Sequence, residues 1–482
     1  MEKSKLIKTL RKLNKEELAS FKTFVDAPYF NKNKKVTALL DLICKDYLFE
    51  PISIDDEVIL NKIHPARSKD PRKLTDLMYK LTLLLEKFLA IAQYERNKFQ
   101  QKINLMSLAY EKDFDALIQG FERDLRQIYN ENPVRDSNYF FETFMIYSQR
   151  DYSFRLSGRI SDDDSLQIKS DHLDLFYLAL KLKDACEMLN RSRIVSGQYD
   201  LKMLNAVIPY LLEHQELYNE HIAIQVYLNM YLMLTDSAHE TWFFQLKTIA
   251  QNNADLFTQD ELRSIYGYIQ NYCIRRLNLG DPDFLYHLFD IYKHVYTTGL
   301  VFGDNKNIEW DFKNFVSLGL RLKEFEWTLK MINDFKDKLP EPIRQNAYTY
   351  NLANYHYETG DYQKATRLLN SVEFTEIYYN LDSKAMLLKI YYKVEEEESF
   401  YSLASSFSIY LKRNRLISKD NAEVYHNLLR FTKKAFQLKT KPDFKSKADY
   451  QSKIAKLKQT INDTPKIMNI NWLREEVNAL AG

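Results

Sequence analysis

The chain has few of the residues that interrupt helices. It contains 10 glycines and 11 prolines among 482 residues, about 4%, where average proteins have about 12%. This scarcity leaves few turns, which is typical of long helices joined by short links. Because the chain is also longer than a single compact core allows, the sequence predicts several domains or, preferably, a repeat array.

Cysteines and long apolar runs are scarce as well. Cys44, Cys186 and Cys273 are odd in number and far apart, which indicates reduced interior thiols rather than a disulfide framework. The first residues carry charges every few positions and lack the apolar run of about 7 to 15 residues that a signal peptide has. No stretch approaches the roughly 18 uncharged apolar residues of a membrane-spanning helix. We therefore expect a cytoplasmic protein.

The chain also lacks an excess of one charge and every common catalytic motif. Its 68 Lys and Arg nearly balance 66 Asp and Glu, so the chain as a whole gives no reason to expect nucleic acid or membrane as a partner. Phosphate-binding glycine loops, HExxH, CxxC and GxSxG are all absent from the sequence. We expect no enzyme activity, no catalytic residue, no cofactor and no metal.

The most informative stretch runs from Asn346 to Tyr379 and predicts a helical hairpin. Its first helix ends near Glu358, a short break turns the chain, and a second helix follows. Gly360 in the break is able to take the left-handed backbone that ends a helix, and the small Ala353 and Ala365 let the two helices approach closely. Such a hairpin cannot bury its apolar face alone, so neighbouring hairpins must stack on it.

This spacing resembles the tetratricopeptide repeat, a helix-turn-helix unit of about 34 residues. Three consecutive units extend between about Glu309 and Arg413, and Pro340 lies at the family's closing proline. The resemblance implies an all-α fold, a right-handed α-solenoid of such hairpins with an N-terminal helical domain and a C-terminal helical cap. The chain also looks like uncharacterised bacterial proteins of this superfamily that carry SPYFN-like residues, here Ala27 to Asn31.

The helical pattern divides the chain into three predicted parts. Residues 1–97 form an N-terminal helical domain, in which Asn14 and Glu17 predict a capping box and Pro71 opens a long helix. Residues 98–437 hold the helix pairs of the solenoid. Residues 438–482 form a basic helical cap, which we expect Trp472 to anchor.

Candidate peptide-binding residues follow from the resemblance, because the first helices of successive tetratricopeptide units line a groove. Carrying the groove positions over gives ten candidates: Trp310, Lys313, Ser317, Arg321, Tyr350, Asn354, Tyr357, Lys384, Leu388 and Tyr391. We expect the rings to supply contact area, and Lys313, Arg321 or Lys384 to meet carboxylates of an extended acidic or C-terminal peptide segment. The alternative is that the three tyrosines only pack between repeat units.

Two other functions stay open beside that of a protein-interaction scaffold. The stretch between residues 433 and 466 contains ten Lys and only three Asp. Such a stretch favours a salt-sensitive, sequence-independent contact with phosphates, as in a nucleic-acid-associated adaptor. One helix carries two Asp-His pairs, Asp283 with His287 and Asp290 with His294. The two His are about 10 Å apart along the helix axis, so a hydrolase or metalloenzyme needs further ligands from elsewhere. We predict a non-enzymatic scaffold that binds a peptide segment or partner protein, with the adaptor as the alternative.

Overall fold

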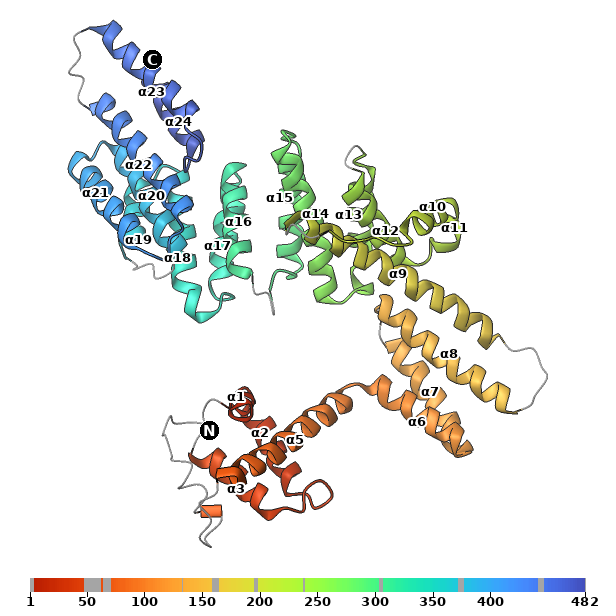
Figure 1. Cartoon of the computed structure of the whole chain (residues 1–482). Helices are drawn as coiled ribbons and strands as arrows, with labels where there is room; N and C mark the ends of the chain where they lie inside the picture. The colour runs from red at the N-terminus through yellow and green to blue at the C-terminus, as the bar shows by residue number, and fades with distance from the viewer. Residues whose placement is uncertain are drawn as a thin grey trace. The chain divides into compact units, whose positions relative to one another are not determined.

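The chain is an all-α protein, an α-solenoid of helical hairpins (Figure 1). The computed structural model describes residues 4–46, 62–63, 71–131, 133–157, 164–194, 198–236, 239–302, 307–371, 377–440 and 446–481. Within these ranges every regular element is a helix. The fold class predicted from the hairpin spacing is therefore confirmed.

The chain divides into two compact units, which we describe separately. Unit 1 is Met1–Tyr231 with Asn253–Phe257, and unit 2 is Leu232–Asn252 with Thr258–Gly482. This division falls inside α12, Ile222–Thr235. The predicted boundaries after residues 97 and 437 stay predictions.

Unit 1 begins with four helices that share one core. They are α1 Lys5–Leu10, α2 Lys15–Asp26, α3 Lys34–Asp46 and α5 Pro71–Arg96. The predicted capping box at the start of α2 is confirmed, because the Asn14 side chain accepts from the Glu17 amide at 2.9 Å and the Glu17 carboxylate accepts from the Asn14 amide at 3.1 Å. Fully buried Phe21, Leu39 and Leu81 come from three of these helices, so the domain has an apolar core of its own.

The rest of unit 1 consists largely of helix pairs. Its helices are α6 Lys98–Glu111, α7 Asp115–Glu131, α8 Ser137–Ser157, α9 Ser165–Ile194, α10 Leu204–Glu213, α11 Gln215–Tyr218, the first part of α12, and the short 3₁₀ helix Ala254–Leu256. Helices α6 and α7 pair through a cluster that includes Ile103 and Leu125. In the α8–α9 pair, the Lys169 ammonium donates to the buried Asp151 carboxylate at 3.0 Å.

Unit 2 contains the hairpins that the sequence pattern located best. Its helices are α13 Thr241–Asn252, α14 Gln259–Asn278, α15 Phe284–Thr297, α16 Ile308–Arg321, α17 Phe325–Lys336, α18 Glu341–Glu358, α19 Tyr362–Ser371, α20 Ile377–Val394, α21 Glu397–Arg413, α22 Lys419–Thr440, α23 Lys447–Asp463 and α24 Ile470–Ala479. In the hairpins from α16 onward, the two helices pack together, and the first helix of one hairpin also contacts the first helix of the next, as α16 does with α18 and α18 with α20 (Figure 1). This is the stacking that a repeat array requires.

The predicted central hairpin is confirmed as α18 and α19. Gly360 lies in the turn with φ +82°, a left-handed conformation that glycine adopts without a steric penalty. Ala353 and Ala365 are fully buried between the helices, as their small size predicted. The Asp361 amide donates to the His356 carbonyl at 2.8 Å and completes the end of α18.

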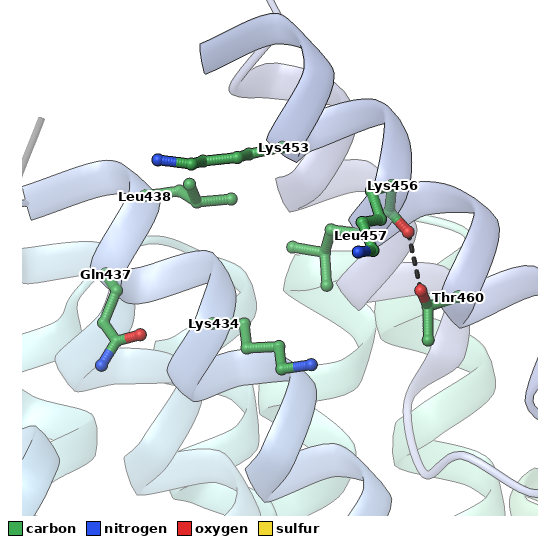
Figure 2. A pocket seen from close by; sticks show the side chains of 7 residues that line it. All are labelled: Lys434, Gln437, Leu438, Lys453, Lys456, Leu457 and Thr460. Atoms are coloured by element: carbon green, nitrogen blue, oxygen red, sulfur yellow. Dashed lines mark hydrogen bonds between the residues drawn. The ribbon is translucent and has the colours of Figure 1, made fainter. Parts of the chain in front are cut away.

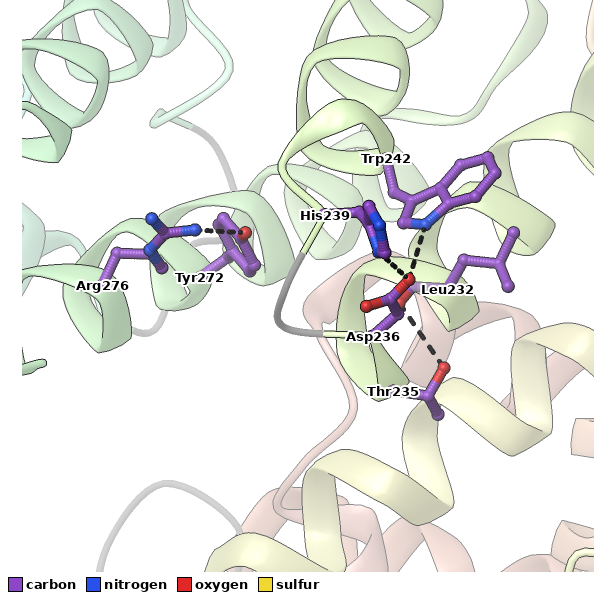
Figure 3. A network of polar contacts seen from close by, with 7 residues as sticks. All are labelled: Leu232, Thr235, Asp236, His239, Trp242, Tyr272 and Arg276. Carbon is purple, nitrogen blue, oxygen red and sulfur yellow. Dashed lines mark hydrogen bonds and ion pairs between the residues drawn. The ribbon is translucent and has the colours of Figure 1, made fainter.

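Arg276 fixes the turn that follows α14. Its guanidinium donates to the Asp281 carboxylate at 2.6 Å and pairs with Glu240. It also donates to the Tyr272 hydroxyl at 3.2 Å (Figure 3). Gly280 in this turn has φ +95°, so the sharp reversal from α14 to α15 combines a glycine with a charged anchor.

Asp236 gathers two ring donors at the end of α12. Its carboxylate accepts from the His239 ring at Nδ1, 2.7 Å away, and from the Trp242 indole N–H at 3.4 Å (Figure 3). Because a carboxylate only accepts, Nδ1 of His239 carries the proton in this contact. The network therefore links the end of α12 to α13.

Candidate functional site

A pocket of about 570 Å³ lies on α16, α18, α20 and α24, and we name it the central pocket. It is lined by Lys313, Ser317, Leu320, Arg321, Tyr350, Asn354, Glu358, Asp382, Ala385, Met386, Lys389, Met468, Asn469, Asn471, Trp472 and Glu475. Three first helices of successive hairpins form one side. The C-terminal helix and the residues just before it form the other.

Half of the ten predicted groove residues line this pocket. Lys313, Ser317 and Arg321 follow one another at four-residue steps along α16, so their side chains share one helix face. Tyr350 and Asn354 do the same on α18. The structure thus brings together five of the seven candidates from the first two units, while their role in binding a peptide stays a prediction.

The three candidates on α20 lie elsewhere, and their register needs a correction. Leu388 is fully buried in the hydrophobic core, and Tyr391 packs against the same core. The Lys384 ammonium lies 5.5 Å from the centre of the Tyr410 ring. The α20 residues that line the pocket include Asp382 and Lys389. A shift of two residues rotates a helix by about 200°, which turns the predicted side chains away from the pocket.

Two further candidates lie beside the pocket without lining it. Tyr357 is buried, and the Lys389 ammonium lies 4.4 Å from the centre of its ring. Trp310 is 49% exposed and lies 5.6 Å from the Lys313 ammonium. Both rings therefore contact lysines that line the pocket.

Lys313 is already neutralised by residues of its own chain. Its ammonium pairs with the Asp382 carboxylate, which also accepts from the Tyr425 hydroxyl at 2.7 Å. The same ammonium lies 5.3 Å from the Tyr350 ring centre and 5.7 Å from that of Tyr379, distances at which a cation is attracted by a ring face. The expectation that Lys313 meets a ligand carboxylate is therefore weakened by the structure.

Lys389 is the pocket cation that sequence reasoning missed. Besides Tyr357, its ammonium lies 5.9 Å from the Trp472 ring centre. It makes no ion pair within the described part of the chain, and burial lowers its pKa, an effect that Glu358, Asp382 and Glu476 partly oppose. A cation that is mostly removed from water without a hydrogen-bonding anion is costly, so Lys389 is suited to receive a carboxylate.

Other polar groups in the pocket also have bonding capacity to spare. The Trp472 indole N–H is buried and has no acceptor among the described residues. Arg321, Asn354 and Glu475 line the pocket and make no side-chain hydrogen bond within the described ranges. The pocket therefore presents donors and acceptors of both charges beside aromatic rings, a mixture suited to recognition of a peptide.

The repeat pattern did not predict that α24 forms one wall of the central pocket. The predicted helix through Trp472 is confirmed, and the ring lies 5.5 Å from Tyr392 in an edge contact. Buried Leu473 and Val477 pack α24 into the core. Glu476 pairs with Lys393 on α20, so α24 is tied to α20 and its outer residues face the pocket.

A second, smaller pocket lies between α22 and α23, and we name it the basic cleft. It measures about 450 Å³ and is lined by Lys434, Gln437, Leu438, Lys453, Lys456, Leu457 and Thr460. Lys453 pairs with Asp449 at 3.0 Å, whereas Lys434 and Lys456 make no ion pair with the described residues. Figure 2 shows Lys434 on one side of the cleft and Lys453 and Lys456 on the other. Residues 441–445 of the predicted basic stretch lie outside the described residues.

The two Asp-His pairs of α15 have structural contacts. Asp290 accepts from the Lys247 ammonium at 3.1 Å. The His287 ring packs against Phe244 at 5.2 Å and the His294 ring against Tyr266 at 5.2 Å. In the described ranges, no three His, Cys, Asp or Glu side chains are grouped so that they are able to hold a metal ion.

Two of the three cysteines have the interior environment that their sequence context predicted. Cys186 and Cys273 are free thiols, 1% and 0% exposed. Burial raises both thiol pKa values, that of Cys273 to about 12, so neither forms a thiolate readily near neutral pH. Cys44 is free and partly exposed.

The chain was compared with protein-family models, curated proteins and solved structures. No protein-family model matches the chain, and no curated protein matches it. Among solved structures, the chain is similar to the apo form of the quorum sensor NprR from B. thuringiensis, with 12% identity and a TM-score of 0.32 over 80% of this chain and 98% of that one. A similarity at this level carries no argument about function. No helix in the described ranges is long and apolar enough to cross a membrane.

Proposed function

We propose that this protein is a non-enzymatic scaffold whose central pocket binds a peptide segment of a partner protein in the cytoplasm. The observation that carries the proposal is the presence of two cations, Lys389 and Arg321, that line the pocket without an ion-pair partner in the described part of the chain. A carboxylate of the bound segment supplies the missing partner for Lys389. This contact is favourable because it gives a partly buried charge a counter-ion.

Neighbouring groups fit the remaining parts of such a segment. The Asn354 amide both donates and accepts, so it suits a peptide bond. The buried Trp472 indole N–H lacks an acceptor, which a carbonyl of the segment provides. Met386 and the Trp472 ring offer apolar contact to one side chain. Glu358 and Glu475 line the same pocket and favour a segment that also carries a cation.

Selection from a random peptide library on the full-length protein tests this proposal. Peptides that are selected should bind the protein in fluorescence anisotropy, and the Arg321→Gln, Lys389→Met double variant should bind them at least about tenfold more weakly, since a hydrogen bond to a charged group contributes about 1.5 to 3 kcal/mol. Lys330→Gln is the matched control, because Lys330 is exposed on α17 and lines no part of the pocket.

Thermal unfolding separates a binding role from a structural one. Lys389→Met removes an unpaired, mostly buried charge and keeps an apolar chain of similar length, so we expect an unfolding temperature equal to or above that of the unchanged protein. Equal peptide affinity of the double variant and the control overturns the proposal. A large loss of stability in Lys389→Met assigns the lysine a structural role instead.

The basic cleft supports a second candidate, a nucleic-acid-associated adaptor. Its unpaired Lys434 and Lys456 favour phosphate contacts that are independent of sequence and sensitive to salt. A gel shift with duplex DNA and with RNA at low salt tests this candidate, comparing the unchanged protein with Lys434→Glu, Lys456→Glu. The candidate requires a shift that the double variant loses, and equal behaviour of the two proteins removes it.

A further inference from the structure

The loop between α2 and α3 is built around Asn31, within the Ala27 to Asn31 motif. The Asn31 amide donates to the Val25 carbonyl at 2.9 Å and to the Thr37 hydroxyl at 3.2 Å, while its oxygen accepts from the Asn33 amide at 2.9 Å. One side chain therefore joins the end of α2 to the start of α3 and fixes the loop between them.

The same loop directs two neighbouring rings differently. The Phe30 ring stacks on Phe24 with centroids 4.0 Å apart, which anchors the loop to α2. Tyr29 is 87% exposed and touches Phe30 edge-on at 5.0 Å. The motif thus holds one aromatic ring in the domain and leaves the next one at the surface.

This loop, the start of α3 and one face of α5 enclose a groove of about 800 Å³, which we name the N-terminal groove. It is lined by Phe30, Asn31, Lys32, Asn33, Lys34, Lys35, Val36, Lys80, Leu83, Leu84 and Lys87. Its accessible lining is mostly carbon. Leu83 is 46% exposed on α5, and Tyr79, one turn before it, is 62% exposed, so this helix face lacks an apolar partner in the described structure.

The described charged residues that line the groove are all lysines. Five lysines line it and no described carboxylate does. Lys80 pairs with Asp76 in the preceding turn at 2.7 Å, but Lys32, Lys34 and Lys87 make no ion pair with the described residues. The Lys87 ammonium instead lies 5.1 Å from the Phe30 ring centre.

We infer that the N-terminal groove docks an amphipathic helix of a partner protein, whose apolar face is flanked by Asp and Glu. The apolar floor takes the helix's hydrophobic side chains, and the lysines at the rim meet its flanking carboxylates. This site goes beyond the peptide pocket of unit 2 and does not depend on it.

A nucleic acid fits the groove less well than such a helix. A phosphate backbone satisfies the lysines but covers no apolar surface, so Leu83 of the groove remains exposed to water. No described arginine lines the groove, and arginine is the side chain that reads phosphates and bases with two parallel hydrogen bonds. The combination of an apolar floor and a lysine rim therefore favours an acidic amphipathic segment.

Three synthetic peptides test the inference on the full-length protein. The first is about 18 residues long, or about five helical turns, with Leu at every third or fourth position and Glu beside the leucines. The second replaces Glu by Lys, and the third has the composition of the first in shuffled order without an apolar face. By fluorescence anisotropy, only the first should bind strongly, and the other two should bind at least about tenfold more weakly.

Variants place the peptide on the groove. Lys32→Glu, Lys34→Glu, Lys87→Glu should weaken binding of the first peptide about tenfold or more, because three attractive contacts become repulsive. The matched control reverses three exposed lysines of the same domain that do not line the groove, Lys8, Lys12 and Lys15, and should bind the peptide as the unchanged protein does. Leu83→Gln, which leaves every charge in place, should weaken binding about fivefold.

Three results overturn the inference. One is that the shuffled peptide binds as tightly as the first peptide. Equivalent to it is a competition in which single-stranded DNA displaces the labelled first peptide at the same concentration as the unlabelled first peptide does. Either result shows a general attraction of polyanions. Another is an equal loss in the control triple variant. The third comes from lysine acetylation mapped by mass spectrometry: protection of Lys32, Lys34 and Lys87 in the free protein means that the chain itself covers the groove.

Discussion

Gly319 offers a sharp test of how α16 packs on α17. A Cβ at this position would meet Thr328 Oγ1 at 2.3 Å and the Trp327 ring at 3.3 Å. Thr328 is fully buried, and its hydroxyl donates to the Glu324 carbonyl at 2.7 Å. The oxygen is therefore held in place, and Gly319→Ala forces a shift of the helices or the loss of that hydrogen bond.

The expected free energy follows from two opposing effects. Overpacking of a core costs about 1 to 3 kcal/mol, whereas replacing glycine by alanine inside a helix gains about 1 kcal/mol. Because Thr328 is fixed, we place the overpacking cost in the upper part of its range, and expect Gly319→Ala to lower the free energy of unfolding by about 1 to 2 kcal/mol. Gly267 in α14 is the matched control, since a Cβ there has nothing within 4 Å. Gly267→Ala should raise the free energy of unfolding by about 0.5 to 1 kcal/mol.

Hydrogen exchange measures this effect where it occurs, because stability in a repeat array is local. In Gly319→Ala, the amides of α16 and α17 should exchange about 5 to 30 times faster, and in Gly267→Ala those of α14 should exchange no faster than before. Adding Thr328→Ala to Gly319→Ala removes the clashing oxygen and should restore part of the protection. Unchanged or slower exchange in Gly319→Ala refutes the packing described for this hairpin.

Three further predictions concern charges and thiols. Asp382→Asn should lower the free energy of unfolding by about 1 to 3 kcal/mol in a urea titration, because Lys313 then lacks its counter-ion in a partly buried position. At neutral pH a disulfide reagent should react with partly exposed Cys44, whereas Cys273 should react only in denaturant, since its thiol is 0% exposed. Burial lowers the pKa of His294, so its imidazole binds a proton more readily in the unfolded chain than in the folded one. The unfolding temperature should therefore fall as the pH drops below about 6.5, and His294→Gln should reduce the fall.

Each of these predictions has its own control. Asp76→Asn breaks the exposed pair with Lys80 and should change stability by less than about 1 kcal/mol, so an equal loss in both variants contradicts the special position of Asp382. Reaction of all three thiols at one rate contradicts the burial of Cys186 and Cys273. An unfolding temperature that rises on acidification, or a pH dependence untouched by His294→Gln, contradicts the role given to this imidazole.

The sequence predicted the elements of the fold well because their signals are local. Gly360, Pro71 and the Asn14 and Glu17 pair each act within a few residues of themselves, and the structure has the expected turn, helix start and capping box there.

The candidate site was predicted only in part because repeat length varies along the chain. With a repeat of 34 residues, the predicted counterpart of Tyr350 on α20 is Lys384. The α20 residue that lines the pocket is instead Asp382, which follows Tyr350 by 32 residues. The pocket wall made by Trp472 depends on contacts between segments far apart in the sequence, which no repeat pattern contains. Lys389 was missed because the repeat length was wrong for α20 and because its contact with Trp472 joins distant parts of the sequence.

Photo-crosslinking in the central pocket tests the proposed function most directly. The Asn354 side chain lines this pocket and makes no hydrogen bond within the described part of the chain, so a benzophenone amino acid placed there faces any bound segment. Cells that make this protein should yield a discrete crosslinked partner from position 354, none from Lys330 on α17, and less from position 354 when Lys389→Met is added. Equal yields from the two positions, or a yield that Lys389→Met does not change, contradict peptide binding in this pocket.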